Sequence, residues 1–345
     1  MSINRYVARY WRKLDANKVE CILCPRHCIL KEGSKGFCSV RKNIDGNLIL
    51  LTYGKCMGLY VDPMEKKPLY HFYPGKNILS FGSAGCNLAC KFCQNWHMSR
   101  ATDAINSSIK ADPESIALAA KEQGCVAVAF TYNDPVIFAE YAIDTAKACR
   151  DLGIKTVAVT AGYINETPRR EFFSYMDAAN VDLKSLSVDF YNRLCSVELQ
   201  PVLDTLVYLK EETDVWFEIT NLVIPNENDS PQDLERLSEW IVDNLGDNVP
   251  VHFSAFHPAF KMLEYPPTPP ETVKKAREIA ISKGIKYVYT GNILDEEGAN
   301  TYCKSCGRLL ISRKWAGEVV LYMENGICPG CGTVCDGFFD VKNSM

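Results

Sequence analysis

Residues 77–93 read NILSFGSAGCNLACKFC, a short apolar run followed at once by three cysteines. The run ends at small residues, so it predicts a buried strand that leads into a tight loop. Cys86, Cys90 and Cys93 lie in that loop, with three residues in the first gap and two in the second. A structural zinc site normally uses four protein ligands, so three thiolates leave one coordination position open. The stretch therefore predicts a strand that leads into an open metal centre.

Apolar runs of the same kind alternate with amphipathic helical stretches as far as about residue 295. Several of these helical stretches begin after Asp, Ser or Pro and end at Gly, as helix termini do. Strand–helix repetition of this length predicts an α/β fold with a parallel sheet, either a barrel or an open sheet. The further strand candidates are 126–131, 155–160, 180–184, 216–223, 251–256 and 286–292.

The chain divides into three regions by composition. Residues 1–74 are rich in cysteine, and glycine and proline interrupt them as they do loops, so we expect a Cys-rich metal-binding region there. Residues 75–295 carry the strand–helix pattern. Residues 296–345 change character again, and we expect a zinc-ribbon-like or rubredoxin-like domain there.

The overall composition is that of an ordinary globular protein. The 345 residues include 38 Lys and Arg against 42 Asp and Glu, a net charge of −4, so nucleic acid is not an expected partner. No apolar run approaches the roughly 18 residues of a membrane span. The first residues are basic and amphipathic and lack the apolar core of a secretory signal. We therefore expect a cytoplasmic protein without a membrane partner.

The sixteen cysteines fall mainly into groups. Disulfides are rare in the cytosol, so grouped thiols there indicate metal ligands or redox centres. Four lie at 21–38, three at 86–93 and five at 303–335. Three isolated cysteines are expected to be small buried residues of the core, namely Cys125, Cys149 and Cys195.

The last group contains two C-x2-C pairs about twenty residues apart. This spacing is typical of a zinc ribbon, although a rubredoxin-like iron site uses the same ligands. The expected ligands are Cys303, Cys306, Cys328 and Cys331. Cys335 is left as a spare or competing ligand, and the role of Cys56 is left open.

The first group has the spacing C-x2-C-x3-C-x9-C and comprises Cys21, Cys24, Cys28 and Cys38. It fits either a zinc ion or a second iron–sulfur cluster. We favour a structural metal, because Pro25 and the nearby glycines indicate a tight, closed loop. His27 lies inside the group and could replace one thiolate.

The three-cysteine loop has four interpretations: an incomplete structural zinc site, a catalytic zinc site, an iron–sulfur cluster or a redox dithiol. Thiolates select zinc or iron–sulfur centres, and three of them leave one iron of a four-iron cluster free for another ligand. In parallel barrels the chemistry lies at the carboxyl ends of the strands. Polar candidates at or near strand ends are Asn133, Asp134, Thr160, Asp182, Lys184, Glu218 and His257.

The segment CNLACKFC resembles the C-x3-C-x-aromatic-C signature of radical S-adenosylmethionine (SAM) enzymes, with Phe92 as the aromatic residue. The resemblance implies a partial (β/α)6-type TIM barrel in which Cys86, Cys90 and Cys93 hold a 4Fe-4S cluster. It also implies that SAM binds the open iron and is cleaved to a 5′-deoxyadenosyl radical that abstracts hydrogen. The protein positions and shields this cofactor chemistry.

Further segments are similar to the pyruvate formate-lyase activating enzyme-like branch, and within it to the radical SAM proteins of the AmmeMemoRadiSam system. This similarity extends over nearly the whole chain. The segments are DPMEKKPLYHFYPG, FTYNDP, NVDLKS, EITNLVIPNENDS, HFSAFHP and YVYTGN.

The resemblance implies roles for individual residues around SAM. Phe92 is expected to back the adenine. Asn133 and Asp134 match the motif that holds the methionyl amine, although the branch more usually has Asn-Glu-Pro. A helix N-cap beside Pro135 is the structural alternative for Asp134. Thr160 belongs to a cofactor-binding motif in which Ala161 stands where the branch tends to have Asn.

Three more roles follow from the same resemblance. Asp182 and Lys184 match an Asp-x-Lys motif that reaches the SAM carboxylate and the substrate side, with a simple ion pair as the alternative. His257 matches a histidine near the SAM carboxylate and ribose. Lys184 and His257 are therefore the catalytic candidates. Glu218 is expected to contact the cofactor or to act as an orienting acid in the barrel.

The predicted function is that of a radical SAM oxidoreductase that abstracts hydrogen from an unidentified protein, nucleotide or small molecule. One alternative is a glycyl-radical-enzyme activase, although the ferredoxin-type insert of many activases is missing after the cysteine loop. A second is a non-catalytic zinc scaffold. We favour a system with MEMO-like and AMMECR1-like partners, because two extra Cys-rich regions bear on substrate choice. A reductant such as ferredoxin or flavodoxin is also expected.

Overall fold

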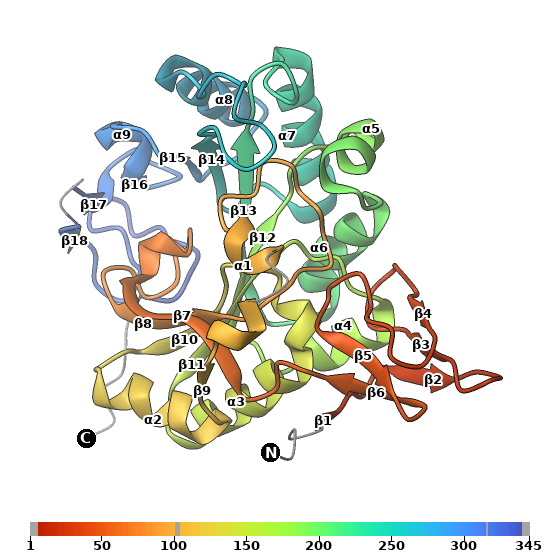
Figure 1. The fold of residues 1–345 in the computed structure, drawn as a ribbon. Coiled ribbons are helices and arrows are strands. Elements are labelled where there is room, and N and C mark those ends of the chain that lie inside the picture. Colours follow the sequence, from red (N-terminus) through yellow and green to blue (C-terminus); the bar gives the residue numbers. More distant parts are fainter. Residues whose placement is uncertain (1–5, 101–103, 315–316, 340–345) are drawn as a thin grey trace.

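The computed structural model describes residues 6–100, 104–314 and 317–339 and is organised around one nine-stranded sheet (Figure 1). The strand order is β15-β14-β13-β12-β11-β10-β8-β7-β9. All neighbouring pairs from β8 to β15 are parallel. These strands are β8 (Asn77–Gly82), β10 (Ala127–Phe130), β11 (Lys155–Thr160), β12 (Ala178–Asp182), β13 (Trp216–Val223), β14 (Val251–Ala255) and β15 (Val288–Gly291).

One main helix follows each of the first six parallel strands and packs on the outer face of the sheet (Figure 1). These helices are α2 (Pro113–Glu122), α3 (Ala139–Asp151), α4 (Glu166–Phe173), α6 (Gln200–Glu212), α7 (Pro231–Leu245) and α8 (Pro270–Ser282). Six strand–helix units followed by a last strand, with the sheet left open at β15 and β9, make a partial barrel. The predicted α/β fold with its parallel sheet is confirmed.

The helices begin where local chemistry favours a start. The side chain of Asp112 accepts a hydrogen bond from Ser115 N at the start of α2, and Ser230 accepts one from Asp233 N at the start of α7. Proline occupies the first turn of both helices, where its missing N–H costs nothing. Short helical turns lie between the main elements: η1 (Met64–Lys66), α1 (Trp96–Ser99), η2 (Ala104–Ser107), η3 (Pro135–Phe138), α5 (Val188–Phe190), η4 (Tyr191–Cys195) and α9 (Glu296–Ala299).

The N-terminal region forms two small antiparallel sheets against one side of the barrel (Figure 1). They are β1-β6-β5 and β2-β3-β4, from β1 (Tyr6–Val7), β2 (Trp11–Lys13), β3 (Val19–Cys21), β4 (Ile29–Leu30), β5 (Arg41–Ile44) and β6 (Asn47–Leu50). The fully buried Arg41 joins this region to the barrel, because its guanidinium forms an ion pair with Glu140 on α3. A buried pair of this kind is costly to break.

Residues 55–74, expected within the N-terminal region, belong structurally to the barrel. β7 (Lys55–Pro63) pairs antiparallel with β8 and also with the short β9 (Ile109–Lys110). The segment after β7 then crosses the interior of the barrel. Met64, Leu69 and Phe72 pack there against small inward-facing residues of the sheet such as Ala127 and Ala178. This segment closes one end of the barrel, which we call the floor.

The C-terminal region packs at the floor, on the opposite side of the barrel from the N-terminal region (Figure 1). It contains a three-stranded sheet of β16 (Thr301–Tyr302), β17 (Leu309–Arg313) and β18 (Val319–Leu321). Phe338 N donates to the carbonyl of His71, which ties this region to the floor segment. The first five residues and the last six lie outside the described residues. No helix in the described part of the chain is long and apolar enough to cross a membrane.

Candidate functional site

The three-cysteine loop leaves β8 at the end of the barrel opposite the floor, which we call the mouth. Gly85 has φ +87, and a Cβ there would lie 2.1 Å from the carbonyl oxygen of Cys38, so only glycine fits. The amide of Asn133 fixes the loop from the end of the next strand. Its Nδ2 donates to Gly85 O over 2.6 Å, and its Oδ1 accepts from Ser83 N over 3.0 Å. The loop is therefore held in place before any cofactor binds.

The thiols of Cys86, Cys90 and Cys93 face buried or half-buried surroundings. Thiols that bind a single ion lie within 4.8 Å of one another, as the C-terminal ones do. Within the described residues, the sulfur atoms of this loop do not form such a group. Burial raises the pKa of Cys86 to about 12, so its thiolate needs a compensating positive charge. The Cys195 thiol, followed by burial, raises the pKa of Cys90. These buried thiols ionise readily only when a cation lies nearby, and they are not grouped around one point. Both features fit a metal–sulfur cluster.

Asp134 and Thr160 lie together beside this loop. The Asp134 carboxylate accepts hydrogen bonds from Thr160 Oγ1 at 2.9 Å, Val136 N at 3.1 Å and Ala161 N at 3.2 Å. The bond to Val136 makes Asp134 the N-cap of η3, which was the structural alternative for this residue. Burial raises the pKa of Asp134 to about 6 despite these bonds. The Asp134 amide also contacts the Cys86 sulfur, so the carboxylate lies next to the thiol loop.

Lys184 and Asp182 form the opposite wall of the mouth. Lys184 Nζ lies 2.7 Å from Asp182 Oδ2 and 5.8 Å from the centre of the Phe92 ring. Burial alone would lower the pKa of Lys184, but Asp182 and the thiols of Cys90 and Cys195 raise it well above its usual range. The ammonium is therefore a permanent positive charge directed at the thiol loop.

His257 lies in the loop after β14, and its side chain is exposed. The same loop approaches the thiol loop, because Lys261 N donates to Lys91 O over 2.9 Å. His257 is thus on the mouth side of the barrel, at its solvent-facing rim rather than among the buried residues.

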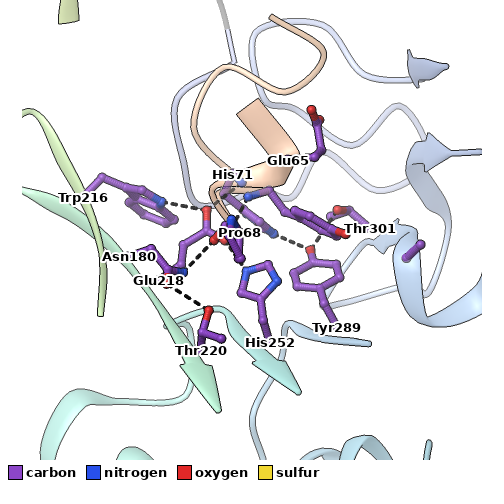
Figure 2. A network of polar contacts seen from close by, with 12 residues as sticks. Glu65, Pro68, His71, Asn180, Trp216, Glu218, Thr220, His252, Tyr289 and Thr301 are labelled. Carbon is purple, nitrogen blue, oxygen red and sulfur yellow. Dashed lines mark hydrogen bonds and ion pairs between the residues drawn. The ribbon is translucent and has the colours of Figure 1, made fainter. Parts of the chain in front are cut away.

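Glu218 is not part of this group. Figure 2 shows its carboxylate surrounded by donors from the floor segment and the neighbouring strands. It accepts from His71 N at 2.7 Å, Tyr70 N at 2.9 Å and Trp216 Nε1 at 3.1 Å, and lies 2.6 Å from His252 Nε2. All of its capacity is used within the protein. Its place in β13 is opposite Asn180, whereas Asp182 at the mouth is opposite Thr220.

The C-terminal cysteines form a compact site separate from the mouth. The sulfur atoms of Cys303, Cys306, Cys328 and Cys331 all lie within 4.8 Å of one another. The Cys303–Cys331 and Cys306–Cys328 pairs are each 3.6 Å apart. Four thiolates about 2.3 Å from one tetrahedral zinc ion would be about 3.8 Å apart, so the group fits a single ion. Cys335 lies outside it, with its sulfur 3.9 Å from His71 Nδ1.

The mouth fits an iron–sulfur cluster with SAM on the chemistry of its donors. The loop offers the three thiols of Cys86, Cys90 and Cys93, and the buried acid Asp134 and the buried ammonium of Lys184 lie beside them. Gly82 packs closely against the end of β10, because a Cβ there would meet Thr131 O at 2.5 Å and Asn133 Oδ1 at 2.7 Å. Ser83 Oγ is buried and has no partner within the described ranges. Such an orphaned atom is expected where a ligand completes the contacts.

A partial parallel barrel with an open three-thiol site at its mouth is the architecture of a cluster-dependent enzyme. The family model described as the radical SAM superfamily matches residues 81–241. An uncharacterized protein of Methanocaldococcus jannaschii is 43% identical over 95% of this chain and 98% of its own length. The chain belongs to the radical SAM superfamily, and it is an enzyme of that type.

Named relatives place it near one branch of the superfamily. The pyruvate formate-lyase-activating enzyme of Listeria monocytogenes is 24% identical over 49% of this chain and 70% of its own length. The pyruvate formate-lyase 1-activating enzyme of Escherichia coli is 22% identical over 63% and 93%. Among solved structures, Streptococcus suis SuiB bound to precursor peptide SuiA has a TM-score of 0.50 at 16% identity, covering 67% of this chain and 51% of that one, a likeness of fold alone.

Sequence reasoning missed two residues that contact the thiol loop. Ser99 Oγ lies 3.4 Å from Cys93 Sγ, and Cys195 lies beside Cys90. Cys195 is fully buried, as predicted, but it lies next to Cys90 of the thiol loop rather than only in the core. No local pattern distinguishes it from Cys125 or Cys149, because the contact depends on the fold of α5 and η4.

Proposed function

We propose that this protein abstracts a hydrogen atom from a protein, nucleotide or small-molecule substrate at the barrel mouth. The single observation that carries the proposal is the set of three spread thiols at the end of β8 in a chain of this superfamily. A reduced four-iron cluster and SAM, when bound, supply a 5′-deoxyadenosyl radical that abstracts hydrogen. The cluster would be held by Cys86, Cys90 and Cys93.

The protein's own residues would bind and orient SAM. Asp134 would attract the methionyl ammonium, because its carboxylate is buried beside Cys86. Lys184 would pair with the methionyl carboxylate, since its charge is desolvated and directed at the loop. Phe92, packed against Phe190 with 6.0 Å between ring centres, offers an apolar face for the adenine. In this proposal Asn133 positions the loop, and Thr160 orients Asp134 without contacting SAM.

His257 would contact the ribose or carboxylate of SAM from the rim once the cofactor is bound. Glu218 is assigned no cofactor contact, because its carboxylate is saturated at the floor. An electron donor such as ferredoxin or flavodoxin would be required, since cluster reduction needs one electron from outside. MEMO-like and AMMECR1-like proteins stay our proposed partners.

Electron paramagnetic resonance of the anaerobically reconstituted, dithionite-reduced protein tests this site. We expect SAM to change the spectrum of the reduced cluster, because SAM binds the iron that the protein leaves open. An unchanged spectrum at saturating SAM would contradict the proposal. Cys335→Ala is a matched control, since that thiol lies outside the mouth, and its spectrum should respond to SAM as the wild type does.

Activation of a glycyl-radical enzyme is a second candidate, favoured by the names of the relatives from Listeria monocytogenes and Escherichia coli. Incubation with SAM, dithionite and a glycyl-radical enzyme should then produce a glycyl-radical signal. A mixture that forms 5′-deoxyadenosine without that signal would favour the other substrate classes. The non-catalytic zinc scaffold is not favoured, because the mouth thiols are not gathered around one ion.

A further inference from the structure

The four N-terminal cysteines surround a cavity. Cys21, Cys24, Cys28 and Cys38 all line one cavity. The rest of its lining comes from Leu23, Arg26, Gly36, Arg41, Asn87 and Ile137. The four thiols also interact electrostatically with one another, so they lie close together around this cavity, as a ligand set would.

The size of this ligand set differs from that of the C-terminal set. The four C-terminal sulfurs lie within 4.8 Å of one another, whereas no three N-terminal sulfurs do so in the described part of the chain. A single tetrahedral ion would require distances of about 3.8 Å between its thiolates. In a four-iron cluster each thiolate binds a different iron, so the sulfurs stand farther apart.

His27 does not replace a thiolate in this set. Its ring is half exposed, with Nδ1 3.0 Å from Glu20 Oε1 and Nε2 3.3 Å from Asn165 Nδ2. Both ring nitrogens are thus engaged away from the cavity. The ligand set is composed of four cysteines, which is the usual set for a [4Fe–4S] cluster.

The N-terminal cavity shares a wall with the mouth loop. Asn87, which follows Cys86 directly, lines the cavity, and Arg26 Nε donates to its carbonyl. Gly85 is in such close contact with the Cys38 carbonyl that no side chain fits between the two loops. The two cysteine loops are therefore in direct contact at Gly85 and Cys38, so an electron would have a short path between them.

The N-terminal region is basic in sequence and carries exposed lysines. The first 50 residues contain ten Lys and Arg against four Asp and Glu, a net charge of +6 in a chain whose net charge is −4. Lys13, Lys31 and Lys35 are exposed. Arg9 and Arg41 form ion pairs with acids of the barrel, so the exposed lysines are the charges that would attract an acidic partner and speed its encounter.

We propose that Cys21, Cys24, Cys28 and Cys38 bind a second four-iron cluster through which an acidic one-electron donor protein reduces the mouth cluster. One electron leaves the reduced donor and reduces the N-terminal cluster from the 2+ to the 1+ state. The same electron then reduces the mouth cluster from 2+ to 1+, and the N-terminal cluster returns to 2+. No bond forms or breaks in this transfer. The relay rests on the proposed function, whereas the presence of the cluster does not.

Metal analysis of the full chain tests the cluster independently of SAM chemistry. We expect about eight irons and about one zinc per chain in the reconstituted wild type. A Cys86→Ala/Cys90→Ala/Cys93→Ala variant should retain about four irons and a four-iron signal on reduction. About four irons and about two zincs in the wild type, or a triple variant without iron, would overturn the proposal. Either result would leave the mouth assignment standing.

Two routes of reduction test the relay. Dithionite is small and should reduce the mouth cluster directly, so Cys24→Ala should form 5′-deoxyadenosine with dithionite but not with reduced ferredoxin or flavodoxin. Equal activity of this variant with both reductants would overturn the relay. Failure of the wild type with dithionite would instead count against the proposed function.

The charge argument has a test that leaves all ligands in place. Lys31→Glu/Lys35→Glu should lower the donor-driven rate about tenfold at low salt, because it reverses charge beside the N-terminal set. Lys274→Glu/Lys275→Glu on α8 is the matched control and should leave that rate unchanged. Equal loss in both double variants would show that the basic region does not bind the donor.

Discussion

The mouth and the floor of the barrel both carry buried polar side chains on the inner face of the same sheet, but the two groups are completed differently. At the floor, Glu218 has protein donors for both of its oxygens, and His71 joins it to the C-terminal region (Figure 2). At the mouth, Lys184 pairs with Asp182 beside three thiols of one loop, and Ser83 Oγ is buried without a partner in the described part of the chain. A hydrogen-bond network whose members all have protein partners stabilises the fold, whereas polar groups without such partners are available to bind a ligand.

The difference teaches that burial and charge alone do not mark a cofactor residue in a barrel. Asp182 and Asn180 lie on one strand two residues apart, yet one reaches the mouth and the other bonds to Pro68 O in the floor segment. The position of a residue along the strand decides whether its side chain lies at the mouth or at the floor. We therefore assign the chemistry to the mouth and a role in stability to the floor.

The largest effect is expected from a mouth thiol. Cys93→Ala should abolish formation of 5′-deoxyadenosine from SAM, because a cluster with two protein ligands is not held in place. The measurement is product formation by the anaerobic protein with dithionite. Cys125→Ala is the control, since that buried thiol belongs to no group, and it should retain activity. If the Cys93 variant still cleaved SAM, the assignment of the cluster to the mouth would be wrong.

Removing the acid at the floor should affect stability strongly and chemistry little. Glu218→Ala leaves two backbone N–H groups and His252 without their acceptor, so the free energy of unfolding should fall by about 3–5 kcal/mol. Chemical denaturation measures this change. Glu264→Ala, at an exposed position, should change it by less than about 0.5 kcal/mol. A stable Glu218 variant that no longer binds SAM would reverse the assignments of mouth and floor.

The floor should also weaken in mild acid. Burial lowers the pKa of His71 to about 4, whereas the unfolded chain takes up that proton near 6.5. The neutral ring therefore contributes stability in full above pH 6.5, and this contribution is lost as the pH falls toward 4. The expected loss of unfolding free energy is about 3 kcal/mol over this range.

Denaturation at pH 6.5, 5.5 and 4.5 separates this effect from that of the adjacent acid. The pKa of Glu218 is lowered by His252 and by neighbouring groups against the effect of burial, so its contribution is lost only below its ordinary value of 4.5. His71→Gln should flatten the slope between pH 6.5 and 4.5, and the exposed-site control His97→Gln should not. An equal slope in all three proteins would contradict the role of His71.

The smallest effect is expected for the ammonium at the mouth. Lys184→Ala should weaken SAM binding about tenfold, or about 1.4 kcal/mol, while the iron content stays unchanged. Equilibrium binding to the reconstituted protein gives the dissociation constant. Lys155→Ala is a suitable control, because its ion pair with Asp177 lies at the start of β11, away from the mouth. An unchanged dissociation constant for the Lys184 variant would leave the Asp182 contact as a purely structural ion pair.

The sequence predicts much of this architecture, because apolar runs and helix ends are local signals. All seven strand candidates correspond to strands of the central sheet, and the thiol loop follows the first of them. The path of residues 64–76 through the barrel is not local, since it depends on hydrophobic contacts with strands far along the chain. The interpretation of Glu218 depended on that path. The sequence around Glu218 indicates a strand, but it does not show which segment of the chain packs against that strand inside the barrel.

The three cysteine groups show the same limit at the level of single sites. Spacing predicts that all three are ligand sets, and the C-terminal pairs fit a single ion, as their C-x2-C pattern indicates. The composition of the N-terminal loop favours a structural metal, although its spacing fits both zinc and a cluster, because the distance between sulfurs depends on how the loop folds against β8. The contact of Gly85 with Cys38 sets that fold, and it joins residues 47 positions apart.

The most direct test of the central claim is SAM cleavage by the anaerobically reconstituted wild-type protein. Dithionite and SAM are added, 5′-deoxyadenosine is measured, and iron and zinc are counted on the same sample. We expect 5′-deoxyadenosine in an iron-containing protein and none when SAM or dithionite is omitted. A protein that contains zinc but no iron and forms no 5′-deoxyadenosine would contradict the account.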